Sequence, residues 1–173
     1  MEACSQHCPS IITVSDGLLG VGCALTGISS IPRGPKDIYH DGFAQGISYD
    51  ASDALYLDGK RLILNAEQTN SAQTVYTVES DPFTEVALCS PAYPSGSYFR
   101  VTASDGMTYE YGNTVDSRFD ISQGITYTWY LNKAADARGN YITYSYMHSD
   151  NFVYPSGIYY GMNENGTGVF NAI

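Results

Sequence analysis

The chain has 173 residues, a length that predicts a single hydrophobic core. Only 15% of the residues are charged, against about 25% in ordinary soluble domains, whereas Tyr, Gly and Pro number 16, 17 and 7. Eighteen acidic and eight basic side chains give a net charge of −10, which repels phosphate groups. We therefore expect many short strands joined by turns, and we exclude nucleic acid and anionic membrane surfaces as partners.

The N-terminal segment lacks the pattern of a signal peptide. Residues 1–8 contain neither a basic region nor an apolar run, so an export signal would have to lie elsewhere. No stretch of about 18 apolar residues occurs in the chain, and no membrane span is predicted. The four cysteines, Cys4, Cys8, Cys23 and Cys89, are too unevenly spaced to indicate a disulfide framework, and their pairing stays open.

The first fifty residues are predicted to bend repeatedly rather than to form a long regular element. Glycines punctuate the apolar stretch 18–31, and Pro32, Gly34 and Pro35 follow. The glycines are Gly17, Gly20, Gly22 and Gly27. Residues 50–54 are compatible with one helical turn, but we expect a loop there.

From about residue 55 onward, period-2 alternation predicts strands, and Asp-Gly pairs predict the turns between them. Asp58 and Gly59 form the first such pair, between two apolar runs. Asp105 and Gly106 form the second, in the same kind of setting. These pairs favour type I′ turns, which require a positive φ at both central residues.

The strongest predicted strand is 125–131, in which every residue is β-branched, aromatic or leucine. Its alternation places Trp129 and Leu131 on one face. Residues 132–138 favour a helix by composition but are too few to form one alone, so we expect a loop.

A third turn is predicted at Gly139 and Asn140, leading into a strand in which Tyr144 and Tyr146 share a face with Ile142. Further strands are expected at 158–160 and from residue 169, separated by a turn. The sequence ends inside this last apolar run without a polar cap, and we therefore expect a truncated fragment. The fold class is thus all-β, built from sequential antiparallel hairpins in a sandwich-like or barrel-like arrangement.

Several side chains could suggest catalysis or metal binding. Cys4, His7 and Cys8 include zinc-ligand types, but no second pair of ligands follows them. His40 adjoins Asp41 as an acid-base pair would, and Ser29 or Ser30 could act as a nucleophile, yet no nucleophile-elbow motif is present. We predict no metal, no cofactor and no catalytic residue.

The acidic pairs and the tyrosines raise two further functions, glycoside hydrolysis and sugar binding. Glycoside hydrolysis needs two carboxylates facing each other across a cleft, which sequence alone cannot establish. The pairs in question are Glu79 with Asp81 and Asp116 with Asp120. Exposed aromatic side chains can stack on sugars, so a carbohydrate-binding or adhesin-like module is the alternative to a structural role for the tyrosines.

A family resemblance begins in the glycine-punctuated segment. Gly20, Gly22, Gly27 and Arg33 stand at the spacing of the opening of the N-terminal region in SpvB-like proteins and insecticidal toxin complex B components. These families are grouped with the Rhs and YD-repeat proteins. Cys23 stands where a tryptophan is usual.

Further segments resemble the same family in the same order, so that the resemblance covers about residues 18–160. They are the hairpin at Asp58 and Gly59, the hairpin at Asp105 and Gly106, and the passage containing Trp129, Asp136, Gly139, Asn140, Tyr144 and Tyr146. Each segment is weakly specific alone, but their order makes chance agreement improbable.

The resemblance implies a structural role. In such proteins, tyrosine-rich strands build a shell around a toxic segment, so the expected partners are the rest of that shell and the enclosed toxin. The expected location is secreted or on the cell surface, with cytoplasmic storage before release. We expect an atypical or poorly ordered segment at 1–17 and an SpvB/Rhs-like region at 18–173 that is incomplete at its C-terminus.

Overall fold

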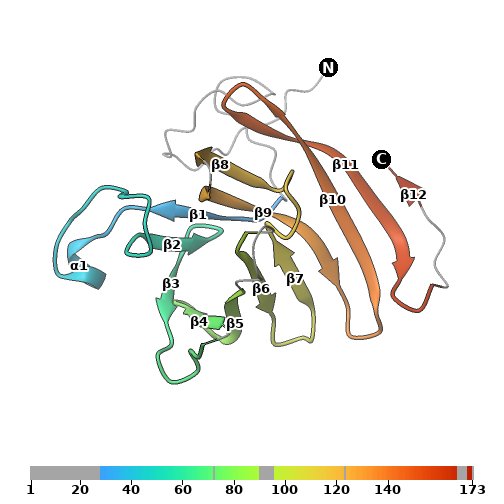
Figure 1. Cartoon of the computed structure of the whole chain (residues 1–173). Helices are drawn as coiled ribbons and strands as arrows, with labels where there is room; N and C mark the ends of the chain where they lie inside the picture. The colour runs from blue at the N-terminus through green and yellow to red at the C-terminus, as the bar shows by residue number, and fades with distance from the viewer. Residues whose placement is uncertain (1–27, 72, 90–95, 123, 167–170, 173) are drawn as a thin grey trace, which may run out of the picture.

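The computed structural model describes residues 28–71, 73–89, 96–122, 124–166 and 171–172 (Figure 1). Within these ranges the chain forms twelve strands and one short helix, α1 (Ile38–Asp41). The strands are β1 (Ser30–Gly34), β2 (Ala54–Leu57), β3 (Lys60–Leu64), β4 (Gln73–Val78), β5 (Asp81–Cys89), β6 (Tyr98–Thr102), β7 (Thr108–Tyr111), β8 (Arg118–Ser122), β9 (Ile125–Ala135), β10 (Asn140–Ser149), β11 (Phe152–Asn163) and β12 (Asn171–Ala172). The predicted all-β class is confirmed.

Eight of these strands form a closed antiparallel barrel. Strands β1 to β7 pair in chain order, β7 pairs with β9, and β9 returns to pair with β1. The closing contact joins Ser30 to Tyr130 and Pro32 to Thr128. Because the ring closes, the barrel strands present far less unpaired edge than an open sheet would.

Strand β9 closes the barrel because it is long enough to pair with four other strands. Its first half pairs with β1 and β8, and its second half pairs with β7 and β10. Trp129 and Leu131, which were predicted to share one face, are both buried in the barrel. The loop predicted from residue 132 is wrong as far as Ala135, because Ala134 and Ala135 are buried between two pairing strands, which overrides alanine's weak preference for β structure.

Strand β1 was not predicted, although the barrel depends on it. Its five residues include Pro32, and only Ile31 offers a large apolar side chain, which is fully buried. The strand forms because it has partners on both sides. Arg33 and Gly34 pair with β2, while the residues before them pair with β9.

One hydrophobic cluster fills the barrel, and every barrel strand contributes to it. Its members are Ile31, Leu55, Leu57, Leu62, Val78, Val86, Phe99, Val101, Tyr111, Trp129 and Leu131. Phe99 and Trp129 meet edge to face, with ring centroids 5.0 Å apart. The interior is therefore a packed core, and the aromatic pair adds a directional contact to its apolar burial.

The predicted turns differ in type. Asp58 and Gly59 have φ values of 49° and 81°, which confirms a type I′ turn between β2 and β3. At the second turn only Gly106 has a positive φ, of 84°, and the amide of Ala103 donates to the carbonyl of Met107. A three-residue loop therefore replaces the predicted type I′ turn, with glycine at the left-handed position.

The third turn repeats this three-residue geometry. The amide of Asp136 donates to the carbonyl of Asn140, and Gly139 has a φ of 80°. The carboxylate of Asp136 also accepts hydrogen bonds from the amides of Arg138 and Asn140. The turn lies where it was predicted, and Asp136 fixes its conformation.

Strands β10 and β11 form a long ribbon on the side of the barrel away from α1, and β12 pairs with its outer edge (Figure 1). The strands predicted around 141–146 and 158–160 are confirmed and extend further. The hydroxyl of Tyr146 donates to the carbonyl of Leu131, and the Asp116 carboxylate accepts from the amide of Tyr146. These contacts fasten the ribbon to the barrel.

We expect replacement of Trp129 by Ala to lower the free energy of unfolding by about 3–5 kcal/mol. Trp129 is 3% exposed, contacts Phe99 and donates from Nε1 to the carbonyl of Ser97 at 2.9 Å. Urea unfolding followed by circular dichroism measures the change, since this substitution removes the chain's single tryptophan. Replacing Phe83, which is 78% exposed, by Ala is the control and should change little. Equal losses in the two variants would contradict this view of the core.

Candidate functional site

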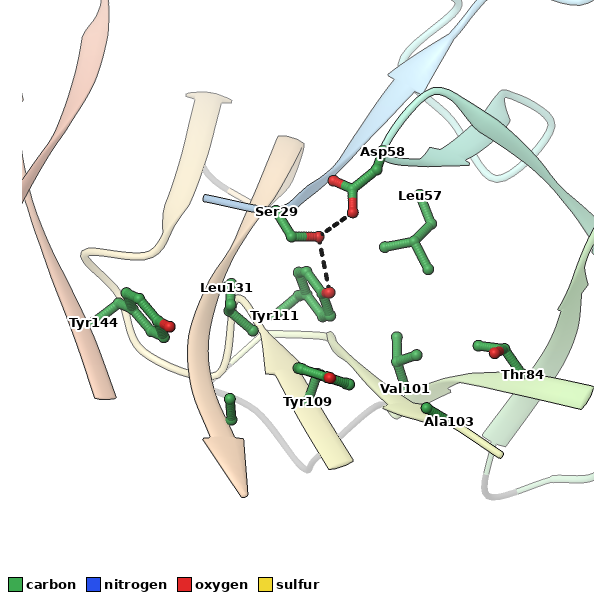
Figure 2. Close-up of a pocket in the computed structure, with 11 residues that line it drawn as sticks. Ser29, Leu57, Asp58, Thr84, Val101, Ala103, Tyr109, Tyr111, Leu131 and Tyr144 are labelled. Atoms are coloured by element: carbon green, nitrogen blue, oxygen red, sulfur yellow. Dashed lines mark hydrogen bonds between the residues drawn. The ribbon is translucent and has the colours of Figure 1, made fainter. Parts of the chain in front are cut away.

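A pocket of about 380 Å³ lies at one end of the barrel (Figure 2). Strands β2, β5, β6, β7, β9 and β10 all contribute to its wall. Its lining consists of the apolar residues Leu57, Val101, Ala103, Leu131 and Ala134, the tyrosines Tyr109, Tyr111 and Tyr144, and the polar residues Ser29, Asp58 and Thr84. We call it the barrel-end pocket.

The strand periodicity explains how these side chains meet. Tyr109 and Tyr111 are two residues apart on β7, so both side chains point to the inner face. Val101 lies opposite Tyr109 on β6 and points the same way. The pairing of β7 with β9 contains a bulge, so that Tyr111 pairs with Leu131 and Tyr109 pairs with Ala134. Because of this bulge, both Leu131 and Ala134 face the pocket.

A hydrogen-bonded group of three side chains lies at the wall of the barrel-end pocket. The hydroxyl of Ser29 donates to Asp58 Oδ2 at 2.6 Å, and its oxygen lies 2.9 Å from the hydroxyl of Tyr111. Ser29 has one hydroxyl proton, so Tyr111 is the donor in the second bond. The amide of Ser30 donates to the other oxygen of Asp58 at 3.1 Å, and both carboxylate oxygens are thus engaged.

This group does not have the chemistry of a nucleophile with its base. Burial raises the pKa of Tyr111 well above its usual range, although the hydrogen bond with Ser29 opposes the rise. The phenol therefore stays protonated and acts as a donor. Ser29 gives its proton to a carboxylate rather than to an imidazole base. The arrangement fixes β1 against the β2–β3 turn.

A second cluster lies around α1. The adjacency of His40 and Asp41 suggested an acid-base pair, but the two side chains do not pair. The Nδ1 of His40 lies 2.7 Å from Asp37 and its Nε2 lies 2.9 Å from Glu79. Asp41 instead accepts two hydrogen bonds from Arg61 on β3, at 2.8 and 3.0 Å. These ion pairs hold α1 against β3 and the β4–β5 turn, beside a pocket of about 540 Å³.

The charges around His40 favour its protonated form. The hydrogen bond to Glu79, followed by that to Asp37, raises the pKa of His40 above 6.5. A raised folded-state pKa adds stability below the unfolded value, and this stability is lost as the pH rises through the folded pKa. The α1 segment is therefore held most firmly at mildly acidic pH.

Two residues of the family resemblance, Arg33 and Tyr144, can be placed at the barrel. Arg33 donates from Nε to the carbonyl of Thr126 at 2.7 Å, lies 5.4 Å from the Trp129 ring and pairs with Asp53 at 3.4 Å. Tyr144 lines the barrel-end pocket. Gly20, Gly22 and Gly27, like Cys4, His7, Cys8 and Cys23, lie outside the described residues, so their predicted roles stay predictions.

Two carboxylates of the acidic pairs considered for catalysis accept hydrogen bonds from nearby threonines. Asp81 accepts from the hydroxyl of Thr84 at 2.6 Å, and Asp120 accepts from that of Thr126 at 2.6 Å. In the described ranges, no three His, Cys, Asp or Glu side chains are grouped as metal ligands. Also within those ranges, no helix has the length and hydrophobicity that crossing a membrane requires.

The importance of Ser29 and Tyr111 is not apparent from the sequence. Sequence alone offers Ser29 as a nucleophile and Tyr111 as one residue of a strand. The Tyr109–Tyr111 alternation indicates a shared face. The contact between Ser29 and Asp58 depends on the pairing of β1 with β2, and the contact between Ser29 and Tyr111 depends on the pairing of β9 with both β1 and β7.

The family assignment follows from sequence comparison. The family described as Salmonella virulence plasmid 65kDa B protein (SpvB) matches residues 49–164, which is more than half of the chain. The chain belongs to the SpvB family. The predicted resemblance is thereby confirmed at the level of SpvB, and the segment 18–48 lies outside the match.

Solved structures share the fold of this SpvB-family chain. The N-terminal domain of effector protein SpvB from Salmonella typhimurium strain LT2 has 17% identity and a TM-score of 0.65, over 82% of this chain and 54% of that one. The Photorhabdus luminescens Tc holotoxin pore has 18% identity and a TM-score of 0.65, over 83% of this chain and 8% of that one. The TcdB2-TccC3 crystal structure has 16% identity and a TM-score of 0.64, with 83% and 8% covered.

The TM-scores show a shared fold, and this chain spans about half of the SpvB domain and a small part of the toxin-complex chains. No curated protein sequence matches the chain.

We expect replacement of Tyr111 by Phe to lower the free energy of unfolding by about 1 kcal/mol, because a buried hydrogen bond to Ser29 is lost while the ring is kept. Fluorescence of Trp129 during urea unfolding measures this change. Tyr160, which is 38% exposed, gives the control as Tyr160→Phe, with little expected loss. A neutral or stabilising Tyr111→Phe substitution would count against the hydrogen-bonded group.

An NMR titration of the His40 ring should give a pKa above 6.5, and Glu79→Gln should lower it because the leading favourable contact is weakened. The control is Glu85→Gln, which removes an exposed carboxylate from β5. A His40 pKa that responds equally to both substitutions would show that the Glu79 contact does not hold the proton.

Proposed function

We propose that this barrel is a non-catalytic structural domain of a secreted toxin assembly of the Rhs and toxin-complex type. In such an assembly it packs against further β-rich domains of a shell that encloses or delivers a toxic segment. Residues 18–173 belong to that region in this proposal, and residues 1–17 form an atypical leading segment.

The observation that carries the proposal is the use of the barrel interior for packing. All eight strands contribute side chains to one continuous core, and Tyr111 and Trp129 are each 3% exposed. Three polar side chains at the barrel-end pocket, Ser29, Asp58 and Tyr111, form a single hydrogen-bonded group. Such an arrangement stabilises a scaffold.

The related structures support the proposal that this barrel is part of a toxin assembly. One is the N-terminal domain of an effector protein, and another is the pore of a Tc holotoxin, of which this fold makes up a small part. A domain that recurs as a minor part of large toxin chains fits a building-block role. Assembly with other toxin components and an extracellular destination follow from this proposal.

The tyrosines favour this proposal over the carbohydrate-binding alternative. Tyr111 and Tyr146 are buried, and Tyr130 packs against Tyr146 with ring centroids 5.3 Å apart. Side chains used in this way hold the barrel and ribbon together, which leaves fewer aromatic faces available for stacking on sugars.

The proposal is tested in the complete protein or complex that contains this chain. Each described Asp and Glu is replaced singly by its amide, and Trp129 is replaced by Ala; folding, assembly size and toxicity are then measured. We expect toxicity to fall with Trp129→Ala because assembly fails, and to follow assembly in every amide variant. A variant that folds and assembles normally but has lost toxicity would identify a chemical role and overturn the proposal.

A further inference from the structure

Aspartates surround the barrel-end pocket. Four hairpin connections meet at this end of the barrel, namely β2–β3, β4–β5, β6–β7 and β9–β10. Each carries an aspartate at or beside its turn: Asp58, Asp81, Asp105 and Asp136 respectively. The basic residues in the same connections are Lys60 and Arg138, so acidic side chains outnumber basic ones around the opening.

Three of these aspartates belong to the pocket lining or lie close to lining residues in the chain. Asp58 is part of the lining (Figure 2). Asp81 accepts a hydrogen bond from the lining residue Thr84. Asp105 lies in the β6–β7 connection, between the lining residues Ala103 and Tyr109.

The fourth turn lies beside the third. A Cβ atom added to Gly106 would lie 3.6 Å from the Cβ of Ala137, so the β6–β7 and β9–β10 connections are in contact. Hydrogen bonds from Asn140 lower the pKa of Asp136, and the hydrogen bond from Thr84 lowers that of Asp81. Both carboxylates therefore carry a full negative charge near neutral pH.

Inside the acidic opening the pocket is apolar and aromatic. Its aliphatic wall includes Leu57, Val101 and Leu131, and tyrosines 109, 111 and 144 also line it. Its volume of about 380 Å³ falls within the usual range of about 300–1,000 Å³ for ligand pockets. An aliphatic stem fits such a wall, and a cation is attracted both to tyrosine rings and to carboxylates at the entrance.

We propose that the barrel-end pocket binds an arginine or lysine side chain presented by a polypeptide segment. The methylene stem packs against the aliphatic and tyrosine side chains, and the cationic head meets Asp58 and the neighbouring aspartates at the opening. The charge of the opening selects a basic segment, and the apolar wall favours a side chain with a long methylene stem over a short one. The inference concerns this surface and stands whether or not the barrel belongs to a toxin shell.

The test uses the full 173-residue chain and two acetylated, amidated five-residue peptides, Gly-Ser-Arg-Ser-Gly and the same peptide with citrulline in place of arginine. Citrulline has nearly the same shape but no charge. Binding is followed by amide shifts in two-dimensional NMR. We expect the arginine peptide to shift amides of the lining residues, to bind about fivefold more tightly than the citrulline peptide, and to weaken as salt is added.

Matched variants locate the binding. Asp58→Asn and Asp105→Asn should each weaken binding of the arginine peptide several-fold, because asparagine removes the charge. Its side-chain oxygen can still accept from the amide of Ser30 at position 58 and from that of Met107 at position 105, although Asp58→Asn removes the acceptor of the Ser29 hydroxyl. Asp120→Asn on β8 removes the same charge away from the pocket and should leave binding unchanged. If Asp58→Asn disturbs the fold, as judged by Trp129 fluorescence, Asp105→Asn still decides the question.

Three outcomes would overturn the inference: equal binding of the two peptides, an equal effect of Asp120→Asn, or no shift of lining amides at millimolar peptide. Shifts of the same amides by a neutral oligosaccharide, without any by the arginine peptide, would likewise replace it by the carbohydrate-binding alternative.

Discussion

The pairing of β1 with β9 is the constraint on which the rest of the structure depends. It joins Ser30 to Tyr130 and turns a row of hairpins into a closed barrel. Only in the closed form can side chains from all eight strands reach one core, and only there does Ser29 meet both Asp58 and Tyr111. Closure also stabilises β1, whose short length and proline would make it a poor strand by itself.

The sequence predicted what local chemistry determines. Alternation placed Trp129 and Leu131 on one face of β9, and Asp58 with Gly59 identified a type I′ turn, although the same reasoning gave the wrong turn type at Asp105 and Gly106. It failed where a distant partner decides the conformation. Strand β1 forms because β2 and β9 both pair with it, and Ala134 and Ala135 extend β9 because β7 and β10 do. The contacts of Ser29 were unpredictable for the same reason, and the acidic opening forms only when separate turns meet at one end.

The structural likeness extends further along the chain than the family match. The family match begins at residue 49, after β1 and α1, whereas the SpvB N-terminal domain shares the fold over 82% of this chain at 17% identity. A core survives such divergence when apolar character and volume are kept, even where the residues change. Barrel closure adds a geometric requirement, because strand number and stagger must stay mutually consistent. Backbone geometry is therefore more persistent here than side-chain identity.

The two ends of the barrel differ in how they are filled. At the end where β6 begins, Trp129 donates to the carbonyl of Ser97, and a Cβ atom on Gly112 would lie 2.2 Å from the Trp129 ring, so the backbone packs directly on the indole. Arg33 covers the same ring. At the end where β6 stops, small residues such as Ala103 and Ala134 leave space, and short aspartate-bearing turns surround it. A large aromatic residue fills one end, and the other combines a recess with unbalanced charge, which is where a partner gains both apolar burial and electrostatic attraction.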